Sequence, residues 1–335
     1  MDPSWASLKD DELLKLRICE LGVTIEGSEL LPHIENLYGV LERRGISVRP
    51  LCYLGDEWFS PTDVPAIAIP FYLAHPRLRQ LELHMMLEVE GGTPDWCDKL
   101  LFHECGHAME HFYRFTRSRK WRSVFGSPDK EYAPETYRPR PYSRSFVRYL
   151  PNWYAQAHPD EDWAETFAVW LSLDKEEWQR RYAGWKALEK LEYMDALMRA
   201  SAKKPPLVTG GRRKSDASRL RTTLERYYAT RRKLFAEDQP DFWDADLRRI
   251  FGEGPGRETA AHFLRRHRHA LVSTTVRWTG EHKYAVDALV RKLITRSRQL
   301  GLRAHDKDAP LLELGAFLSA LVTNHLHTGK FKRSV

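Results

Sequence analysis

Two histidines four residues apart, His103 and His107, constrain the fold of this 335-residue chain more than any other feature. On a helix, residues i and i+4 share a face, so both imidazoles can reach one metal ion. Glu104 lies roughly 100° round the same helix, near enough to hydrogen-bond a metal-held water without becoming a ligand. Thr93 and Pro94 supply a cap and a first helical position. We therefore expect a buried helix from about residue 94 to about residue 117.

A second pair of side chains, Glu161 and Glu165, is also spaced i, i+4, on an expected helix from about 160 to 172. Two histidine ligands need a third protein ligand if a tetrahedral zinc is to keep one position open for water. Glu161 can supply that ligand, and Glu165, one turn further on, can accept the ring N–H of a ligand histidine. The reverse assignment of the two glutamates is also open. These residues predict a Zn²⁺-dependent hydrolase in which Glu104 is the general base.

The two motifs together resemble those of the gluzincins, zinc metallopeptidases that combine H-E-x-x-H with E-x-x-x-E on a later helix. The order E-D-W-A-E-T-F at residues 161–167 is similar to that of lethal-factor-like zincin catalytic domains. In that group, a tyrosine seven residues before the ligand glutamate hydrogen-bonds the reacting carbonyl. Tyr154 stands at that spacing before Glu161, so the resemblance implies a catalytic role for Tyr154.

A longer stretch, from about Leu21 to Leu171, resembles a bacterial family described as zinc-binding metallopeptidases. The likeness is carried by short segments that include Ile69–Pro76, the H-E-C-G-H motif, Arg138–Ser143 and His158–Asp162. It implies a zincin-like catalytic domain with a peptide or protein substrate. The metzincin and M1 aminopeptidase patterns are not present in the sequence.

Periodicity along the chain predicts an α+β fold that is predominantly helical with a small sheet. Residues 46–54 and 64–73 are expected to be strands, and prolines place the second at a sheet edge, where an extended peptide could pair with it. The alternating run from Leu78 to Val89 is expected to be a third strand. We expect a zincin-like domain over 1–200, a Lys-, Pro- and Gly-containing linker over 201–214, and an all-helical domain over 215–335.

Composition narrows the setting in which such a protein works. No run approaches the roughly 20 apolar residues that a membrane span needs, and the N-terminal residues do not resemble a secretory signal. Four cysteines are scattered without a C-x-x-C pair. Reduced thiols and a cytoplasmic location, with no membrane partner, are therefore expected.

Positive charge is concentrated near the motifs. The chain has 53 basic and 46 acidic residues, and residues 111–148 alone hold ten Lys and Arg against three Asp and Glu. This excess favours an acidic peptide or protein as substrate. The alternative function is a zincin-scaffold binding module that recognises an acidic protein or, less favoured, nucleic acid through the Arg/Tyr loop at 137–149 and the helical C-terminal domain. A binding module would not need Glu104, so the intact motif favours the enzyme; the motifs specify neither the scissile bond nor an oligomeric state.

Overall fold

The computed structural model describes residues 3–132, 139–140, 142–202, 204–235, 243–305 and 309–328. Its contacts divide the chain into two compact units, and the division falls between Tyr227 and Tyr228, inside helix α9 (Leu224–Phe235). A short stretch at 86–88 also groups with the second unit. Both units are built mostly from helices.

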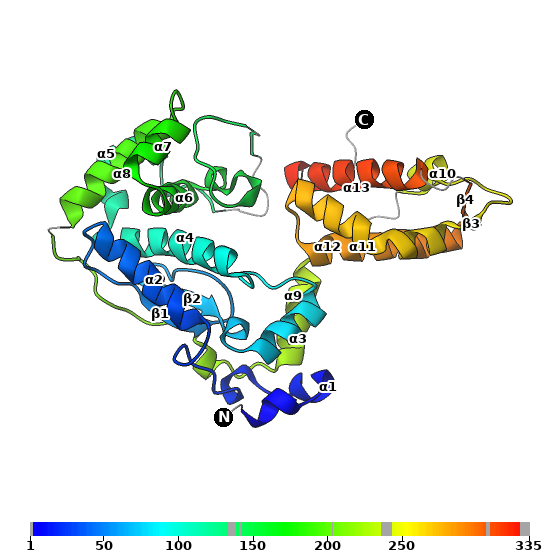
Figure 1. Cartoon of the computed structure of the whole chain (residues 1–335), viewed down its shortest axis with the longest axis horizontal. Helices are drawn as coiled ribbons and strands as arrows, with labels where there is room; N and C mark the ends of the chain where they lie inside the picture. The colour runs from blue at the N-terminus through cyan, green and yellow to red at the C-terminus, as the bar shows by residue number, and fades with distance from the viewer. Residues whose placement is uncertain are drawn as a thin grey trace. The chain divides into compact units, whose positions relative to one another are not determined.

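The first unit holds all the residues of the predicted site. Its strands are β1 (Leu51–Gly55) and β2 (Ala66–Pro70), and its α-helices before α9 are α1 (Asp10–Leu13), α2 (Leu30–Arg43), α3 (Pro76–Met86), α4 (Pro94–Tyr113), α5 (Arg119–Phe125), α6 (Pro159–Ser172), α7 (Lys175–Arg181) and α8 (Ala187–Ser201). Short 3-10 helices lie at η1 (Ser4–Ser7), η2 (Ile18–Glu20), η3 (Phe71–Ala74), η4 (Phe115–Arg117), η5 (Pro151–Gln156) and η6 (Ala217–Arg219). Helix α4 packs against α6 on one side and against α2 and β2 on the other (Figure 1).

The two strands pair in parallel, from Leu51 opposite Ala66 to Gly55 opposite Pro70. Every residue of β2 is buried. Its other edge is not open as predicted, because Ala68 exchanges backbone hydrogen bonds with Phe59: the Ala68 N–H donates at 2.8 Å and the Phe59 N–H at 3.4 Å. An extended peptide therefore finds no free backbone groups at Ala68.

The strand predicted over 78–89 is wrong, since most of this run lies in helix α3. Leu78, Leu81 and Glu82 are buried, a three- and four-residue spacing that belongs to a helix. Leu83, which the alternating pattern would place inside, is 47% exposed. Pro76 at the first helical position suits this start, because its missing N–H has no helical partner there in any case.

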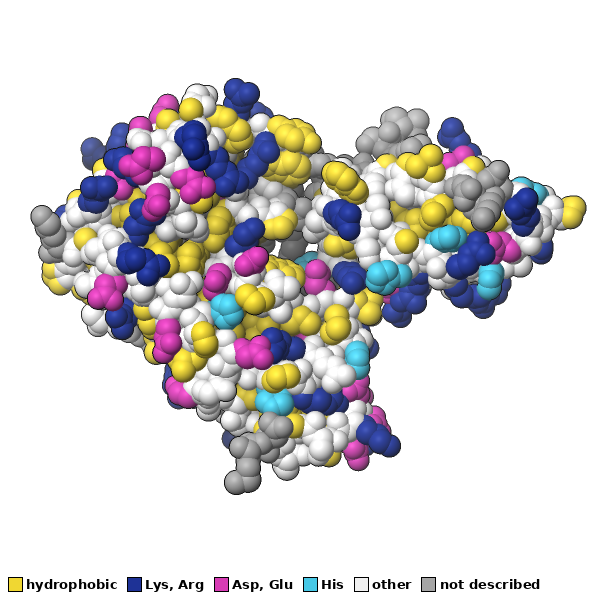
Figure 2. Space-filling model, in the orientation of Figure 1, with side chains coloured by type: hydrophobic (Ala, Val, Ile, Leu, Met, Phe, Trp, Pro, Cys, Tyr) yellow, Lys and Arg dark blue, Asp and Glu magenta, His cyan; other side chains and the backbone are white. Residues whose placement is uncertain are grey.

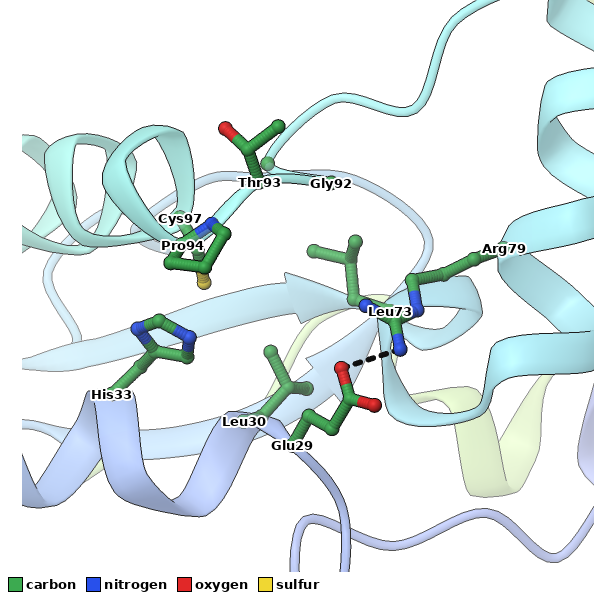
Figure 3. A pocket seen from close by; sticks show the side chains of 10 residues that line it. Glu29, Leu30, His33, Leu73, Arg79, Gly92, Thr93, Pro94 and Cys97 are labelled. Atoms are coloured by element: carbon green, nitrogen blue, oxygen red, sulfur yellow. Dashed lines mark hydrogen bonds and ion pairs between the residues drawn. The ribbon is translucent and has the colours of Figure 1, made fainter.

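Helix α4 begins at the predicted place but ends at Tyr113, four residues early, where Arg114 turns left-handed with φ 53°. Its first turn faces α2 across a cavity of about 50 Å³ (Figure 3). The cavity has room for only a few water molecules. An ion pair between Glu29 and Arg79 lies beside it, and His33 bonds Asp98 of α4 at 2.6 Å. The His33–Asp98 bond ties α2 to α4, the helix that bears the histidines, and the Glu29–Arg79 pair ties the start of α2 to α3.

Helix α6 is held against α8 by a buried ion pair. Lys190 donates to Asp162 over 2.6 Å, and its ammonium lies 4.1 Å from the centre of the Phe146 ring. At the start of α6, His158 bonds in two directions: its Nδ1 accepts from the Asp160 N–H, and its Nε2 donates to the carbonyl of Lys130. These contacts fix the orientation of the helix that bears both glutamates.

The second unit has its own apolar core. Its elements are α10 (Asp244–Ile250), β3 (Glu258–Thr259), α11 (Ala260–Thr279), α12 (Lys283–Gln299), β4 (Arg303–Ala304) and α13 (Ala309–Thr328). Leucines such as Leu264, Leu289 and Leu318 are fully buried among these helices. Lys, Arg and His side chains gather along the α11–α12 side of the unit (Figure 2).

The prediction that this part is all-helical is wrong in one detail. The residues before α11 and after α12 pair as two short antiparallel strands, β3 and β4. This pairing supplies hydrogen-bond partners for backbone groups next to the helix ends, where the helix itself supplies none.

The segment 201–214, predicted as a linker, lies on the first unit over its described residues. The N–H groups of Leu207 and Val208 donate to the carbonyl of Phe112, and the Tyr53 hydroxyl donates to the carbonyl of Lys214. The division within α9 lies beyond this segment. That residues 1–200 fold as a domain stays a prediction.

We predict that Lys190→Met lowers the free energy of unfolding by about 3–5 kcal/mol, because it leaves the buried Asp162 carboxylate unpaired. Burial raises the pKa of Asp162 from 3.8 to about 7 even with Lys190 beside it. Because this folded-state pKa exceeds the unfolded one, the folded state binds the extra proton, and stability falls as pH rises from about 4 to 7. At pH 5 Asp162 is mostly protonated and needs no partner, whereas at pH 8 its charge needs Lys190. The loss of unfolding free energy in Lys190→Met, measured by urea unfolding, should therefore be larger at pH 8 than at pH 5.

Two controls accompany this measurement. Lys175→Met breaks the half-exposed Lys175–Asp195 pair and should cost less than about 1 kcal/mol. Adding Asp162→Asn to Lys190→Met should remove the contribution of Asp162 to the pH dependence of the unfolding free energy. An equal loss at every pH would contradict the role given to Asp162.

Candidate metal centre

Three side chains from two helices point at one place. Nε2 of His103 lies 3.3 Å from Nε2 of His107, and the Oε2 atom of Glu161 lies 3.0 Å from the first and 3.3 Å from the second. His103 and Glu161 are buried, and His107 is half-buried. Helix periodicity places the two imidazoles on one face of α4, and the crossing with α6 brings the carboxylate to them.

The distances suit a metal ion. Ligand atoms at 2.0–2.1 Å from a tetrahedral zinc are separated from one another by about 3.3–3.4 Å. The three atoms therefore occupy corners of such a tetrahedron almost without adjustment, with the fourth corner left to water or substrate. Two imidazole nitrogens and one carboxylate oxygen are also a donor set that zinc accepts in catalytic sites. His103, His107 and Glu161 form a group that can hold a metal ion.

Glu165 contacts the other ring nitrogen of His103 and does not join the three converging atoms. Its Oε1 atom lies 3.0 Å from Nδ1 of His103, and its Oε2 atom accepts the N–H groups of Tyr149 and Leu150. A proton on Nδ1 of His103 leaves the Nε2 lone pair free for a metal. The carboxylate is fully buried, so the three contacts fix both its position and the ring of His103. Of the two assignments left open by the sequence, this arrangement favours Glu161 as ligand, and the ligand role itself stays a prediction.

The electrostatics of the group favour a positive charge at its centre. Burial disfavours the charged form of His103, yet hydrogen bonds to Glu161 and Glu165 raise its pKa well above the usual value. Burial likewise opposes ionisation of Glu161, but the charge of His107 and the hydrogen bonds of both imidazoles lower its pKa well below the usual value. A metal cation placed between the three atoms would be stabilised by the same negative charge of the glutamates.

Glu104 is buried beside this group without belonging to it. Burial raises its pKa, and the charges of His107 and His103 act in the opposite direction. No described residue forms a hydrogen bond with its carboxylate. The carboxylate is therefore available to accept a proton from a water held at the site.

Two tyrosines lie near Oε1 of Glu161, the oxygen that does not contact the histidines. The Tyr132 hydroxyl donates to Oε1 of Glu161 at 2.8 Å and lies 3.2 Å from the Tyr154 hydroxyl. The Tyr154 ring centre is 5.7 Å from that of His103. Burial, followed by the charge of Glu161, raises the pKa of Tyr154, so this phenol keeps its proton. Trp153, just before it, adopts φ 52°, a costly conformation for an aromatic residue.

Sequence reasoning missed Tyr132, because no fixed spacing links it to either motif. Its only sequence signal is that residues 126–152, a stretch that also contains the Arg/Tyr loop at 137–149, are rich in Pro, Tyr and Arg. Part of that segment, including Arg138, lies outside the described residues. In the described part, Arg144 and Arg148 lie over the ring of Trp185 at 6.0 and 5.4 Å, so these two arginines pack on the protein itself.

His111 continues the four-residue spacing of the motif but does not join the group. Its Nδ1 atom lies 3.0 Å from Oε2 of Glu110. The four cysteines, all in described parts of the chain, are free. None of the helices in the described ranges is both long and apolar enough to cross a membrane.

Comparison with known proteins identifies the stretch that carries the site. Residues 100–204 match the model of a family described as "Putative zinc-binding metallo-peptidase". The match spans most of α4 and all of α5 to α8, and it contains both histidines and both glutamates. It confirms the resemblance to that family over these residues. No curated protein and no solved structure matches the chain.

We predict that Gly106→Ala weakens metal binding at least tenfold. A Cβ atom on Gly106 would lie 2.8 Å from the Cα atom of Ala164, so α4 and α6 would have to separate where the ligands meet. Overpacking of this kind should also destabilise the protein by about 1–3 kcal/mol. Zinc affinity can be measured by competition with a chromophoric chelator, and stability by urea unfolding.

The matched control is Gly39→Ala, in the middle of α2. There the added Cβ meets only Arg43, at an ordinary 3.5 Å, so stability should rise by about 0.4–1 kcal/mol and zinc affinity should not change. Equal zinc affinity in the two variants would show that the helix crossing does not set the ligand positions.

Proposed function

We propose that the protein is a zinc-dependent hydrolase of amide bonds, of the peptidase type, with His103, His107 and Glu161 as metal ligands. The observation that carries the proposal is the convergence of three donor atoms at 3.0–3.3 Å inside the stretch that matches the metallopeptidase family. A purely structural zinc is disfavoured, since such sites usually have four protein ligands. Three protein ligands leave one coordination position for water, which suits catalysis instead.

The reaction follows from the groups around the site. His103, His107 and Glu161 would hold a zinc ion, which would supply a Lewis acid and lower the pKa of a bound water to about 7. Glu104 would take a proton from the attacking water and pass it to the leaving nitrogen as the amide bond breaks. Burial raises the pKa of Glu104, which makes the carboxylate a stronger base than an exposed one.

The tyrosines act on the other side of the site. Tyr154, whose proton is retained, donates a hydrogen bond to the oxygen on which negative charge develops, in line with the gluzincin likeness. Tyr132 holds the Oε1 atom of Glu161, so Oε2 stays directed at the metal position. Glu165 holds the ring of His103 in the same way. Two of the three proposed metal ligands, Glu161 and His103, therefore each have a neighbour that orients them.

The substrate we propose is a peptide or protein, and the setting the cytoplasm. The alternative, a binding module that uses the Arg/Tyr loop and the helical C-terminal part, stays a prediction. The available Glu104 carboxylate supports the enzyme over this alternative, since binding alone needs no general base.

We predict that purified protein contains about one zinc per chain by elemental analysis. Glu161→Gln should lose most of this zinc, because it removes a ligand charge. Glu165→Gln should keep zinc under saturating conditions with about 10–100-fold lower affinity, because it only weakens the orientation of His103. The opposite order of the two variants would reverse the assigned roles, and wild-type protein free of zinc after zinc loading would exclude the proposed function.

We predict that Glu104→Gln retains zinc and lowers the rate of amide hydrolysis about 10²–10⁴-fold, since it removes only the proton acceptor. The rate can be followed on a quenched fluorescent peptide library. The matched control is Glu177→Gln on the exposed face of α7, which should hydrolyse at the wild-type rate. Hydrolysis that survives Glu104→Gln undiminished would remove Glu104 from the mechanism.

A further inference from the structure

Residues 207–220, here called the basic strap, are fixed along the surface of the first unit. Two backbone N–H groups, of Leu207 and Val208, donate to the carbonyl of Phe112 at 2.8 and 3.2 Å. Further along, the Tyr53 hydroxyl donates to the carbonyl of Lys214 at 2.7 Å. Gly211 passes so close to Val64 that a Cβ atom there would lie 2.5 Å from its Cγ2. The strap is thus a built part of this unit.

A hollow of about 510 Å³ lies between the strap and residues 61–64. Its lining includes the apolar side chains of Pro61, Val64 and Leu220 and the cations of Arg212, Lys214 and Arg219. The volume falls in the range of sites that take a small ligand or a short peptide segment.

The positive charge in this hollow is not neutralised from within. Arg212, Lys214 and Arg219 are exposed, and none of them forms an ion pair with a described residue. The one carboxylate of the lining, Asp216, is buried. Its Oδ1 atom accepts from the N–H and hydroxyl of Ser218, and its Oδ2 atom lies 3.2 Å from Nε of Arg213. Three cations are therefore left for a ligand.

The chemistry of the lining distinguishes between anionic partners. Guanidinium groups bind carboxylates with two parallel hydrogen bonds, and the apolar residues can contact aliphatic side chains between those carboxylates. Proteins that hold single-stranded nucleic acid generally offer aromatic rings on which bases stack. No aromatic side chain lines this hollow in the described part of the chain.

We propose that the basic strap and residues 61–64 form a binding groove for an acidic peptide segment in which Asp or Glu alternates with aliphatic residues. The groove is separate from the metal group in its residues. It goes beyond the proposed hydrolase activity and does not depend on zinc.

The test is fluorescence anisotropy with a fluorescein-labelled peptide, Glu-Leu-Asp-Leu-Glu-Leu-Asp, on the whole 335-residue chain carrying Glu104→Gln, so that hydrolysis of the probe is slowed. The triple variant Arg212→Ala, Lys214→Ala, Arg219→Ala should weaken binding at least tenfold, and binding should weaken as salt rises. The same peptide with Gln and Asn in place of Glu and Asp should bind at least tenfold more weakly.

A second triple variant controls for net charge and folding. Arg180→Ala, Arg181→Ala, Lys186→Ala removes three exposed cations elsewhere in the first unit and should change the affinity less than twofold. Equal effects of the two triple variants, or no binding of the acidic peptide, would overturn the proposal. Tighter binding of a 12-nucleotide single-stranded DNA, lost in the strap variant, would reassign the groove to nucleic acid.

Discussion

The close crossing of helices α4 and α6 is the constraint on which the rest of the site depends. Gly106, between the two histidines, faces Ala164, between the two glutamates, with no room for another carbon atom. The Trp163 indole N–H also donates to the carbonyl of Gly106 at 2.7 Å. Small residues at the crossing let the helix axes approach, and only at this separation do side chains from both helices meet within ligand distance.

From that crossing, the division of labour between the two glutamates follows directly. One turn of helix separates them, so Glu161 reaches Nε2 of His103 while Glu165 reaches Nδ1 of the same ring. The outer contacts of both carboxylates come from the chain before α6: Tyr132 bonds Glu161, and the backbone of Tyr149 and Leu150 bonds Glu165. Described residues between α5 and α6 therefore position the carboxylates of Glu161 and Glu165.

The convergence of His103, His107 and Glu161 can be predicted from the sequence because much of its geometry is local. The i, i+4 rule orients His103 and His107 on any helix, and it does the same for Glu161 and Glu165. Tyr132 could not be predicted, since its contact depends on how an irregular segment returns to α6. The strand prediction for the run from Leu78 is wrong for another reason. The leucines of this run fit the two-residue period of a strand as well as the period of a helix, and only the burial of Leu78 and Leu81 shows that it is a helix. Segment 201–214 has linker composition, but hydrogen bonds to Phe112 hold it in place.

The backbone exchange between Phe59 and Ala68 has a consequence for molecular recognition. An unpaired strand edge is a general template that accepts almost any extended chain, including another copy of the same protein. Here that template is occupied at Ala68, which suppresses indiscriminate strand pairing at this point. A polypeptide that binds beside Ala68 is then selected by the chemistry of its side chains, so at this point its amino-acid sequence matters more than its readiness to adopt a β conformation.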